Sequence, residues 1–193
     1  SLDIQSGEFI AFIGTSGSGK TTALRMINRM IEATDGQIMM NGKDVRNMNP
    51  VELRRSIGYV IQQIGLMPHM TIRENLVVRA LAAEQDIILM DEPFGALDPI
   101  TRDTLQDLVK ELQQKLGKTF IFVTHDMDEA IKLADKICIM SKGKVVQYDT
   151  PDNILRYPAN DFVRDFIGQN RLIQDRPNMK SVESAMIKPV TVK

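Results

Sequence analysis

Apolar residues in this chain gather in short uninterrupted runs that amphipathic stretches separate. Residues 9–13 (FIAFI), 87–90 (IILM) and 119–124 (TFIFVT) are three such runs, and each predicts a strand buried on both faces. Between the second and third runs, apolar residues recur at helical spacing over 105–112, and Asp98-Pro99 predicts the N-terminal cap of that helix. Strands that alternate with helices predict an α/β fold in which helices flank a mostly parallel sheet.

Turn and cap signals mark the smaller elements. Asn41-Gly42 predicts a two-residue hairpin turn, Asn49-Pro50 predicts the start of a short helix, and Gly117 predicts the end of the long helix. Residues 1–4 (SLDI) alternate like an edge strand. The other expected elements are hairpin strands over 37–40 and 43–45, a strand over 57–62, a helix over 126–135, strands over 137–140 and 144–148, and two short helices within 151–168.

A glycine-rich loop joins the first buried strand to the helix that follows it. Its sequence GTSGSGKT matches the pattern G-x-x-x-x-G-K-[ST] in full, with the strand and the helix that this motif requires on either side. Backbone N–H groups of such a loop surround a phosphate chain, and the helix adds its positive dipole end. In this motif the lysine reaches the β and γ phosphates and the threonine hydroxyl binds Mg²⁺. We therefore predict a nucleoside triphosphate site made of Gly14, Thr15, Ser16, Gly17, Ser18, Gly19, Lys20, Thr21 and Thr22.

Polar residues follow the other two buried strands directly. Asp91 and Glu92 come after residues 87–90, and His125 comes after residues 119–124. Two adjacent acids are often only a solvated loop, and a lone histidine is more often structural. Here, however, the carboxyl ends of parallel strands share one edge with the glycine-rich loop. We expect Asp91 to hold Mg²⁺ and Glu92 to orient or deprotonate the attacking water.

Composition limits the possible partners. The chain has 193 residues, which suits one domain or one domain plus a fragment of another. Its 24 basic and 25 acidic residues give a formal charge of −1, so the sequence does not support nucleic-acid binding. The single cysteine, Cys138, cannot form an internal disulfide, and we expect it to be a small buried residue in a strand. The sequence contains no apolar run long enough to span a bilayer. If the protein acts at a membrane, we expect it to do so through a partner protein.

Taken together, these residues resemble the ATP-binding subunit of ABC transporters. GTSGSGKTT is similar to its Walker A motif, IILMDEP to its Walker B, GALD at 95–98 to its D-loop and VTHD to its switch histidine. Residues 59–72 (YVIQQIGLMPHMTI) resemble the Q-loop segment, and the spacing to Pro68-His69 selects Gln62 rather than Gln63. Five motifs in the family's order cover residues 1–168, which makes the resemblance specific.

The resemblance implies a RecA-like P-loop NTPase fold with an N-terminal antiparallel β subdomain, and a homodimer that sandwiches two ATP molecules. It implies further that closure of the pair drives integral-membrane permease subunits at the cytoplasmic face of the membrane, with an extracytoplasmic substrate-binding protein as an indirect partner. The implied roles are general base for Glu92, γ-phosphate contacts for Lys20 and His125, the Mg²⁺ and water group for Thr21, Gln62 and Asp91, and a cross-dimer contact for Asp98.

The chain departs from this family in two ways. The LSGGQ signature and most of its helical subdomain are absent, and the join lies near residues 77–79. Either the protein lacks this segment, or the segment exists and is missing from this sequence, and we favour the second explanation. The aromatic residue that stacks on adenine in the family would lie upstream of the first strand. We therefore expect Tyr59, Tyr148 and Tyr157 to be packing residues.

The C-terminal part of the chain points to one subgroup within the ABC transporter family. Residues 150–168 resemble the end of importer cassettes, residues 169–180 a linker, and residues 181–193 (SVESAMIKPVTVK) the start of a CBS domain that is cut off. Cassettes with CBS domains serve importers of glycine betaine, carnitine, choline and similar osmoprotectants. A generic tail is the alternative for these last residues. Two other functions stay open: a soluble ABC-type ATPase acting on DNA or ribosomes, and a truncated nucleotide-binding module with little activity.

Overall fold

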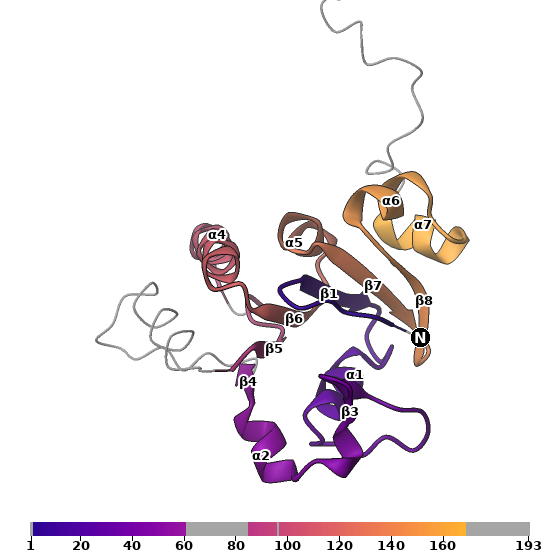
Figure 1. The fold of residues 1–193 in the computed structure, drawn as a ribbon. Coiled ribbons are helices and arrows are strands. Elements are labelled where there is room, and N and C mark those ends of the chain that lie inside the picture. Colours follow the sequence, from indigo (N-terminus) through magenta and orange to yellow (C-terminus); the bar gives the residue numbers. More distant parts are fainter. Residues whose placement is uncertain (1, 61–84, 96, 169–193) are drawn as a thin grey trace, which may run out of the picture.

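The fold is built around one six-stranded sheet. The computed structural model describes residues 2–60, 85–95 and 97–168. Within these residues the strands run in the order β4-β5-β6-β1-β7-β8, and every neighbouring pair is parallel except β7 and β8 (Figure 1). The strand bounds are Phe9–Gly14 for β1, Ile57–Val60 for β4, Ile87–Asp91 for β5, Thr119–Thr124 for β6, Lys136–Ser141 for β7 and Lys144–Asp149 for β8.

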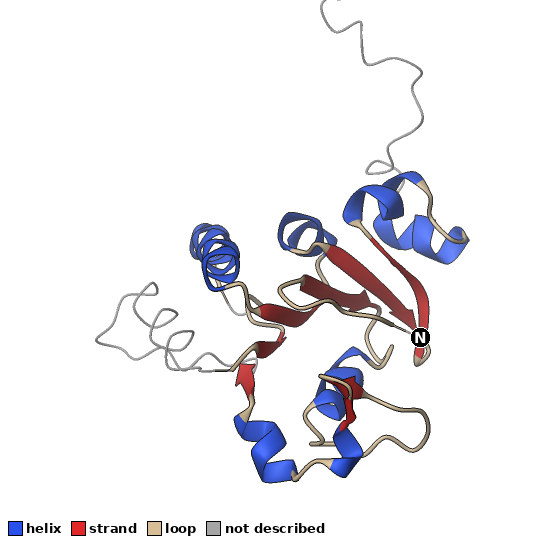
Figure 2. Cartoon of the chain, viewed as in Figure 1, coloured by secondary structure: helices blue, strands red, loops and turns tan. Residues whose placement is uncertain are grey.

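Helices cover both faces of this sheet (Figure 2). One face carries α4 (Pro99–Leu116), α5 (Met127–Leu133), α6 (Pro151–Arg156) and α7 (Asp161–Ile167). The other face carries α1 (Lys20–Ile27), η1 (Val45–Asn47), α2 (Pro50–Arg55) and a hairpin of β2 (Met39–Met40) with β3 (Lys43–Asp44). The predicted α/β architecture is therefore confirmed, and in the described part of the chain the second, antiparallel sheet is limited to this short hairpin.

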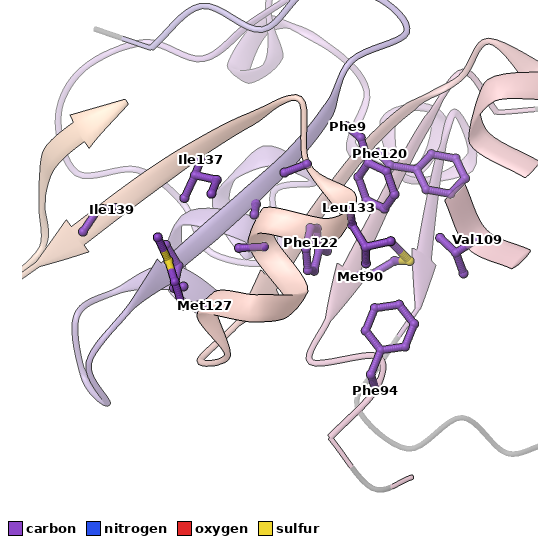
Figure 3. Close-up of a cluster of buried hydrophobic side chains, with 14 of the residues drawn as sticks. Phe9, Met90, Phe94, Val109, Phe120, Phe122, Met127, Leu133, Ile137 and Ile139 are labelled. Carbon is purple, nitrogen blue, oxygen red and sulfur yellow. The ribbon is translucent and has the colours of Figure 1, made fainter. Parts of the chain in front are cut away.

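Strand β1 is the centre of the core because its side chains are buried on both faces. Phe9, Ala11 and Ile13 point into the cluster under α4 and α5, whereas Ile10 and Phe12 point into the cluster around α1 and α2. The ring of Phe9 packs edge-on against Phe120 and Phe122, each at 5.3 Å between ring centres (Figure 3). A run without polar alternation is what a central parallel strand requires.

Several expected strands differ from the structure, and the hairpin strands expected over 37–40 and 43–45 are shorter, at Met39–Met40 and Lys43–Asp44. The prediction of an edge strand over residues 1–4 is wrong, since the described residues 2–5 join no sheet. Their side chains explain the alternation instead, because Leu2 and Ile4 pack against the core and the Tyr148 hydroxyl donates to the Asp3 carbonyl at 2.9 Å. The strand expected over 57–62 is observed over Ile57–Val60, and its last two positions lie outside the described residues.

None of the helices in the described ranges has both the length and the apolar character needed to cross a bilayer.

Candidate functional site

The candidate site lies where β5, β6 and β1 end beside one another. Their register pairs Asp91 with Val123 and Thr124 with Ile13, so the three strands end at nearly the same level. Residues that follow these ends therefore meet at one edge, although they are far apart in the sequence. This is the position at which open α/β sheets bind ligands.

Close packing shapes the glycine-rich loop at the end of β1. Gly14 has φ 154°, and a Cβ there would lie 2.8 Å from the Ser18 hydroxyl and deep inside the contact radius of the Met140 carbonyl oxygen. Gly19 has a left-handed conformation and precedes α1 without a side-chain cap. The N–H of Gly143, in the turn after β7, donates to the Ser18 carbonyl at 3.0 Å. The glycine-rich loop is thus held against β7 and the turn that follows β7.

Lys20 places its ammonium group at the centre of this loop. Its Nζ donates to the Gly14 carbonyl at 2.9 Å, to the Thr15 carbonyl at 3.0 Å and to the Ser18 hydroxyl at 3.4 Å. Burial lowers the pKa of Lys20, while the nearby charges of Glu92 and Asp91 act in the opposite direction. A desolvated cation held among backbone groups attracts a phosphate more strongly than a hydrated one would.

Thr21 and Asp91 form the second part of the site. The Thr21 hydroxyl donates to Asp91 Oδ1 at 2.9 Å, and the Asp91 side chain is almost buried. Hard oxygen donors of this kind suit Mg²⁺, which takes few protein ligands and completes its shell with phosphate oxygens and water. The described residues contain no cluster of three or more His, Cys, Asp or Glu side chains suited to a metal ion.

Two further residues contact Asp91 and were missed from the sequence. Arg25 Nη2 lies 3.7 Å from Asp91 Oδ2, and the Tyr59 hydroxyl lies 3.5 Å from the same oxygen. A hydrogen bond with Tyr59 raises the pKa of Arg25. Tyr59 and Tyr148 pack against the core as expected, whereas Tyr157 is 62% exposed, so that expectation is wrong for Tyr157. The Tyr59 hydroxyl also reaches the site. Arg25 stands four positions after Thr21 on α1, and that helical spacing was a signal that it shares the face of Thr21.

Glu92 and His125 approach each other across the ends of β5 and β6. Their closest atoms, Glu92 Oε2 and His125 Nδ1, are 3.7 Å apart. Glu92 has φ 45°, a left-handed conformation that non-glycine residues adopt at a cost and that concentrates at functional sites. Its N–H donates to the Val123 carbonyl at 3.0 Å, which anchors the turn to β6. The structure thus brings together the acid and the histidine that the sequence analysis selected.

The other predicted site residues are placed less directly. Asp98 is the N-cap of α4, where Oδ1 accepts from the N–H groups of Ile100 at 3.2 Å and Thr101 at 3.1 Å. Hydrogen bonding, first from the Thr101 side chain, lowers the pKa of Asp98. Ser16, Gly17 and Thr22 lie in the described loop and in α1. Gln62 lies outside the described residues.

Comparison with known proteins agrees with this geometry. The family model described as "ABC transporter" matches residues 1–144. The chain is 54% identical to a carnitine transport ATP-binding protein of Listeria monocytogenes, over 99% of this chain and 60% of that protein. It is 52% identical to a glycine betaine/carnitine/choline transport ATP-binding protein of Bacillus subtilis, over 99% of this chain and 63% of that protein.

Solved structures show the same fold. A dimeric ATP-binding cassette in a post-hydrolysis state, bound to ADP and phosphate, superposes with a TM-score of 0.66 at 28% identity. The match covers 78% of this chain and 88% of that chain. The chain spans about 60% of the length of the Listeria relative. Of that relative, 240 residues align with a chain of 193, so the aligned region includes residues that have no counterpart here.

Proposed function

Because this chain belongs to the ABC transporter family, we propose that it hydrolyses ATP to power an importer of quaternary-amine osmoprotectants. The observation that carries the ATPase part is the meeting of Lys20, the Thr21–Asp91 pair and the Glu92–His125 pair at one sheet edge. Carnitine, glycine betaine and choline are proposed as solutes because these names appear in the descriptions of the two relatives reported above.

In the proposed mechanism each group of site residues has one task. The loop N–H groups and Lys20 bind the phosphate chain of ATP, and Thr21 and Asp91 hold Mg²⁺ together with Gln62. Bound Mg²⁺ neutralises charge on the transferred phosphate. Glu92 accepts a proton from, or orients, the attacking water, and His125 contacts the γ-phosphate and fixes it in line.

The proposed assembly follows the family. We propose a homodimer with Asp98 near the partner cassette, docked on permease subunits at the cytoplasmic face of the membrane, with a substrate-binding protein as an indirect partner. The dimeric form of a related cassette supports the first part. The proposed domains are the ATPase domain over 1–168, a linker over 169–180 and the start of a CBS domain over 181–193. We also propose that a helical signature subdomain is missing near 77–79; the relative's aligned region, which is longer than this chain, supports a missing segment but does not give its position.

Replacing the proposed base tests the function. In the subunit assembled with its transporter, we expect Glu92→Gln to bind ATP normally and to lower turnover by about 100-fold or more. Lys20→Ala should instead lose ATP binding itself, because the buried ammonium in the loop is gone. ATP binding is measured with a fluorescent analogue and turnover by phosphate release. Unchanged turnover in Glu92→Gln would remove Glu92 from the mechanism.

A further inference from the structure

A buried carboxylate lies next to the site and plays no part in the proposed chemistry. Glu129, in the first turn of α5, has only 6% of its surface exposed. Its Oε2 accepts from the Thr124 hydroxyl at 2.6 Å, and its Oε1 accepts from Gln106 Nε2 of α4 at 3.3 Å. Burial raises the pKa of Glu129, and the hydrogen bond from Thr124 opposes that rise. Burying a carboxylate lowers the stability of the fold unless hydrogen bonds or an opposite charge compensate. The residues that bond to Glu129 are therefore the ones whose positions it can fix.

One of these partners, Thr124, directly precedes His125 in the sequence. Thr124, the residue before it, donates to Glu129 and also accepts from the N–H of Asp126, the residue after it, at 3.0 Å. Asp126 in turn caps α5, which packs on the core (Figure 3). The His125 side chain itself is 68% exposed, so packing does little to fix it. The position of His125 therefore depends on its sequence neighbours Thr124 and Asp126. These two residues are held by a cluster of Glu129, Thr124 and Gln106, here called the Glu129 cluster.

Arg102 extends this cluster to the loop before α4. Its Nη2 donates to the Leu97 carbonyl at 3.1 Å, directly before Asp98. Its Nη1 lies 4.0 Å from Asp126 Oδ2, and its Nε lies 3.9 Å from Glu129 Oε1. That Nε is buried and lacks a hydrogen-bond partner among the described residues. A relative movement of α4 and α5 by about 1 Å would bring Nε within hydrogen-bond distance of Glu129.

We propose that Glu129 and Arg102 are positioning residues that set His125 in register with the loop ending at Asp98. Glu129 acts through Thr124, and Arg102 joins Glu129 and Asp126 to the Leu97 carbonyl. A movement of the loop that ends at Asp98 thereby shifts His125, and a movement of His125 shifts that loop. This inference rests on the proposed function, since it assigns a task to the histidine of the ATP site.

Nucleotide discrimination tests the inference. His125 would contact only the γ-phosphate, so Glu129→Gln should weaken ATP binding by about five- to tenfold while ADP binding stays within about twofold. Thr124→Val keeps the volume but removes both the donor to Glu129 and the acceptor for the Asp126 N–H, and it should weaken ATP binding at least as much. Asp128→Asn is the matched control, because it removes an exposed acid from the same turn of α5 and should change neither constant. Competition with a fluorescent nucleotide in the presence of Mg²⁺ gives both dissociation constants.

Several results would overturn it. Equal losses of ATP and ADP binding would mean that Glu129 only stabilises the fold. In a double variant, Glu129→Gln should add nothing to His125→Ala, and additive losses would show that Glu129 does not act through His125. If Asp128→Asn weakened ATP binding as much as Glu129→Gln, the cause would be the loss of negative charge at the start of α5 and not the contacts of Glu129.

If the unmodified chain binds neither nucleotide, the proposed function fails, and the inference is judged without nucleotide. The chain has two histidines, so imidazole NMR signals are assigned by comparison with His125→Ala. Glu129→Gln should shift the His125 ring signal, and Arg102→Lys should shift it only when Glu129 is present. An unchanged His125 signal in Glu129→Gln would refute the coupling.

Discussion

Single residues in the glycine-rich loop are fixed by space as much as by chemistry. Gly14 combines φ 154° with a direct approach to the Met140 carbonyl of β7, so neither its conformation nor its surroundings admit a side chain. Gly17 is also left-handed, with φ 73°, but a Cβ there would meet no atom within 4 Å. The same motif therefore contains glycines that are required for different reasons.

This difference predicts unequal costs. Gly14→Ala should lower the free energy of unfolding by about 3 kcal/mol or more, since it adds a steric clash with backbone to the conformational strain. Gly17→Ala, the matched control, should cost about 1 kcal/mol from the left-handed conformation alone. Urea denaturation followed by circular dichroism measures both. Similar costs for the two variants would show that the approach to Met140 is relieved by a backbone shift.

At the scale of elements, helix ends follow local rules in this chain. Asn49 caps α2 through Oδ1, which accepts from the N–H groups of Val51 at 2.9 Å and Glu52 at 3.4 Å, with Pro50 in the first turn. Gly117 ends α4 with φ 62°, as the sequence predicted. The α2 cap matters because Leu53 of this helix is fully buried in the core cluster that also contains Leu24 of α1 and Ile57 of β4.

Removal of this cap should weaken α2. We expect Asn49→Ala to lower the free energy of unfolding by about 1 kcal/mol, because two N–H groups of the first turn lose their acceptor. Asn49→Asp keeps an acceptor and should retain most of the stability. Urea midpoints of the three proteins give the comparison. If the aspartate variant lost as much as the alanine variant, the cap would not be the source of the effect.

At the scale of the whole molecule, the strand order assembles the site. Thr21 and Asp91 are 70 positions apart in the sequence, yet they form a 2.9 Å hydrogen bond because α1 packs beside the ends of β1, β6 and β5. His125 reaches Glu92 for the same reason. A ligand that contacts all of these groups binds the folded state alone and therefore stabilises the fold as a whole.

Nucleotide should accordingly raise the stability of the domain. ATP with Mg²⁺ at a concentration about 100 times its dissociation constant should add about 2.7 kcal/mol to the free energy of unfolding. The gain should shrink when EDTA removes Mg²⁺ and should vanish in Lys20→Ala. Thermal unfolding curves with and without ligand provide the measurement. An equal gain in Lys20→Ala would place the nucleotide somewhere other than this loop.

Elements with local causes could be predicted from neighbouring residues alone. The strand over 119–124 was predicted to the residue, as were the caps at Asn49, Asp98 and Gly117. Strand burial follows from apolar runs and caps follow from single side chains, so neighbouring residues suffice to predict them. The glycine-rich loop and the two acids at the end of β5, Asp91 and Glu92, were found in the same way, because each group belongs to one continuous segment.

Contacts between side chains that are distant in the sequence became known from the packing of the elements. The contacts of Arg25 and Tyr59 with Asp91 join three separate elements, and the Glu129 cluster joins α4, β6 and α5. The alternating residues 2–5 joined no sheet, because Leu2 and Ile4 pack against the core and the Asp3 carbonyl accepts from the Tyr148 hydroxyl rather than from a neighbouring strand. Such contacts depend on packing between elements, and the local pattern of a sequence does not record where packing will place its neighbours.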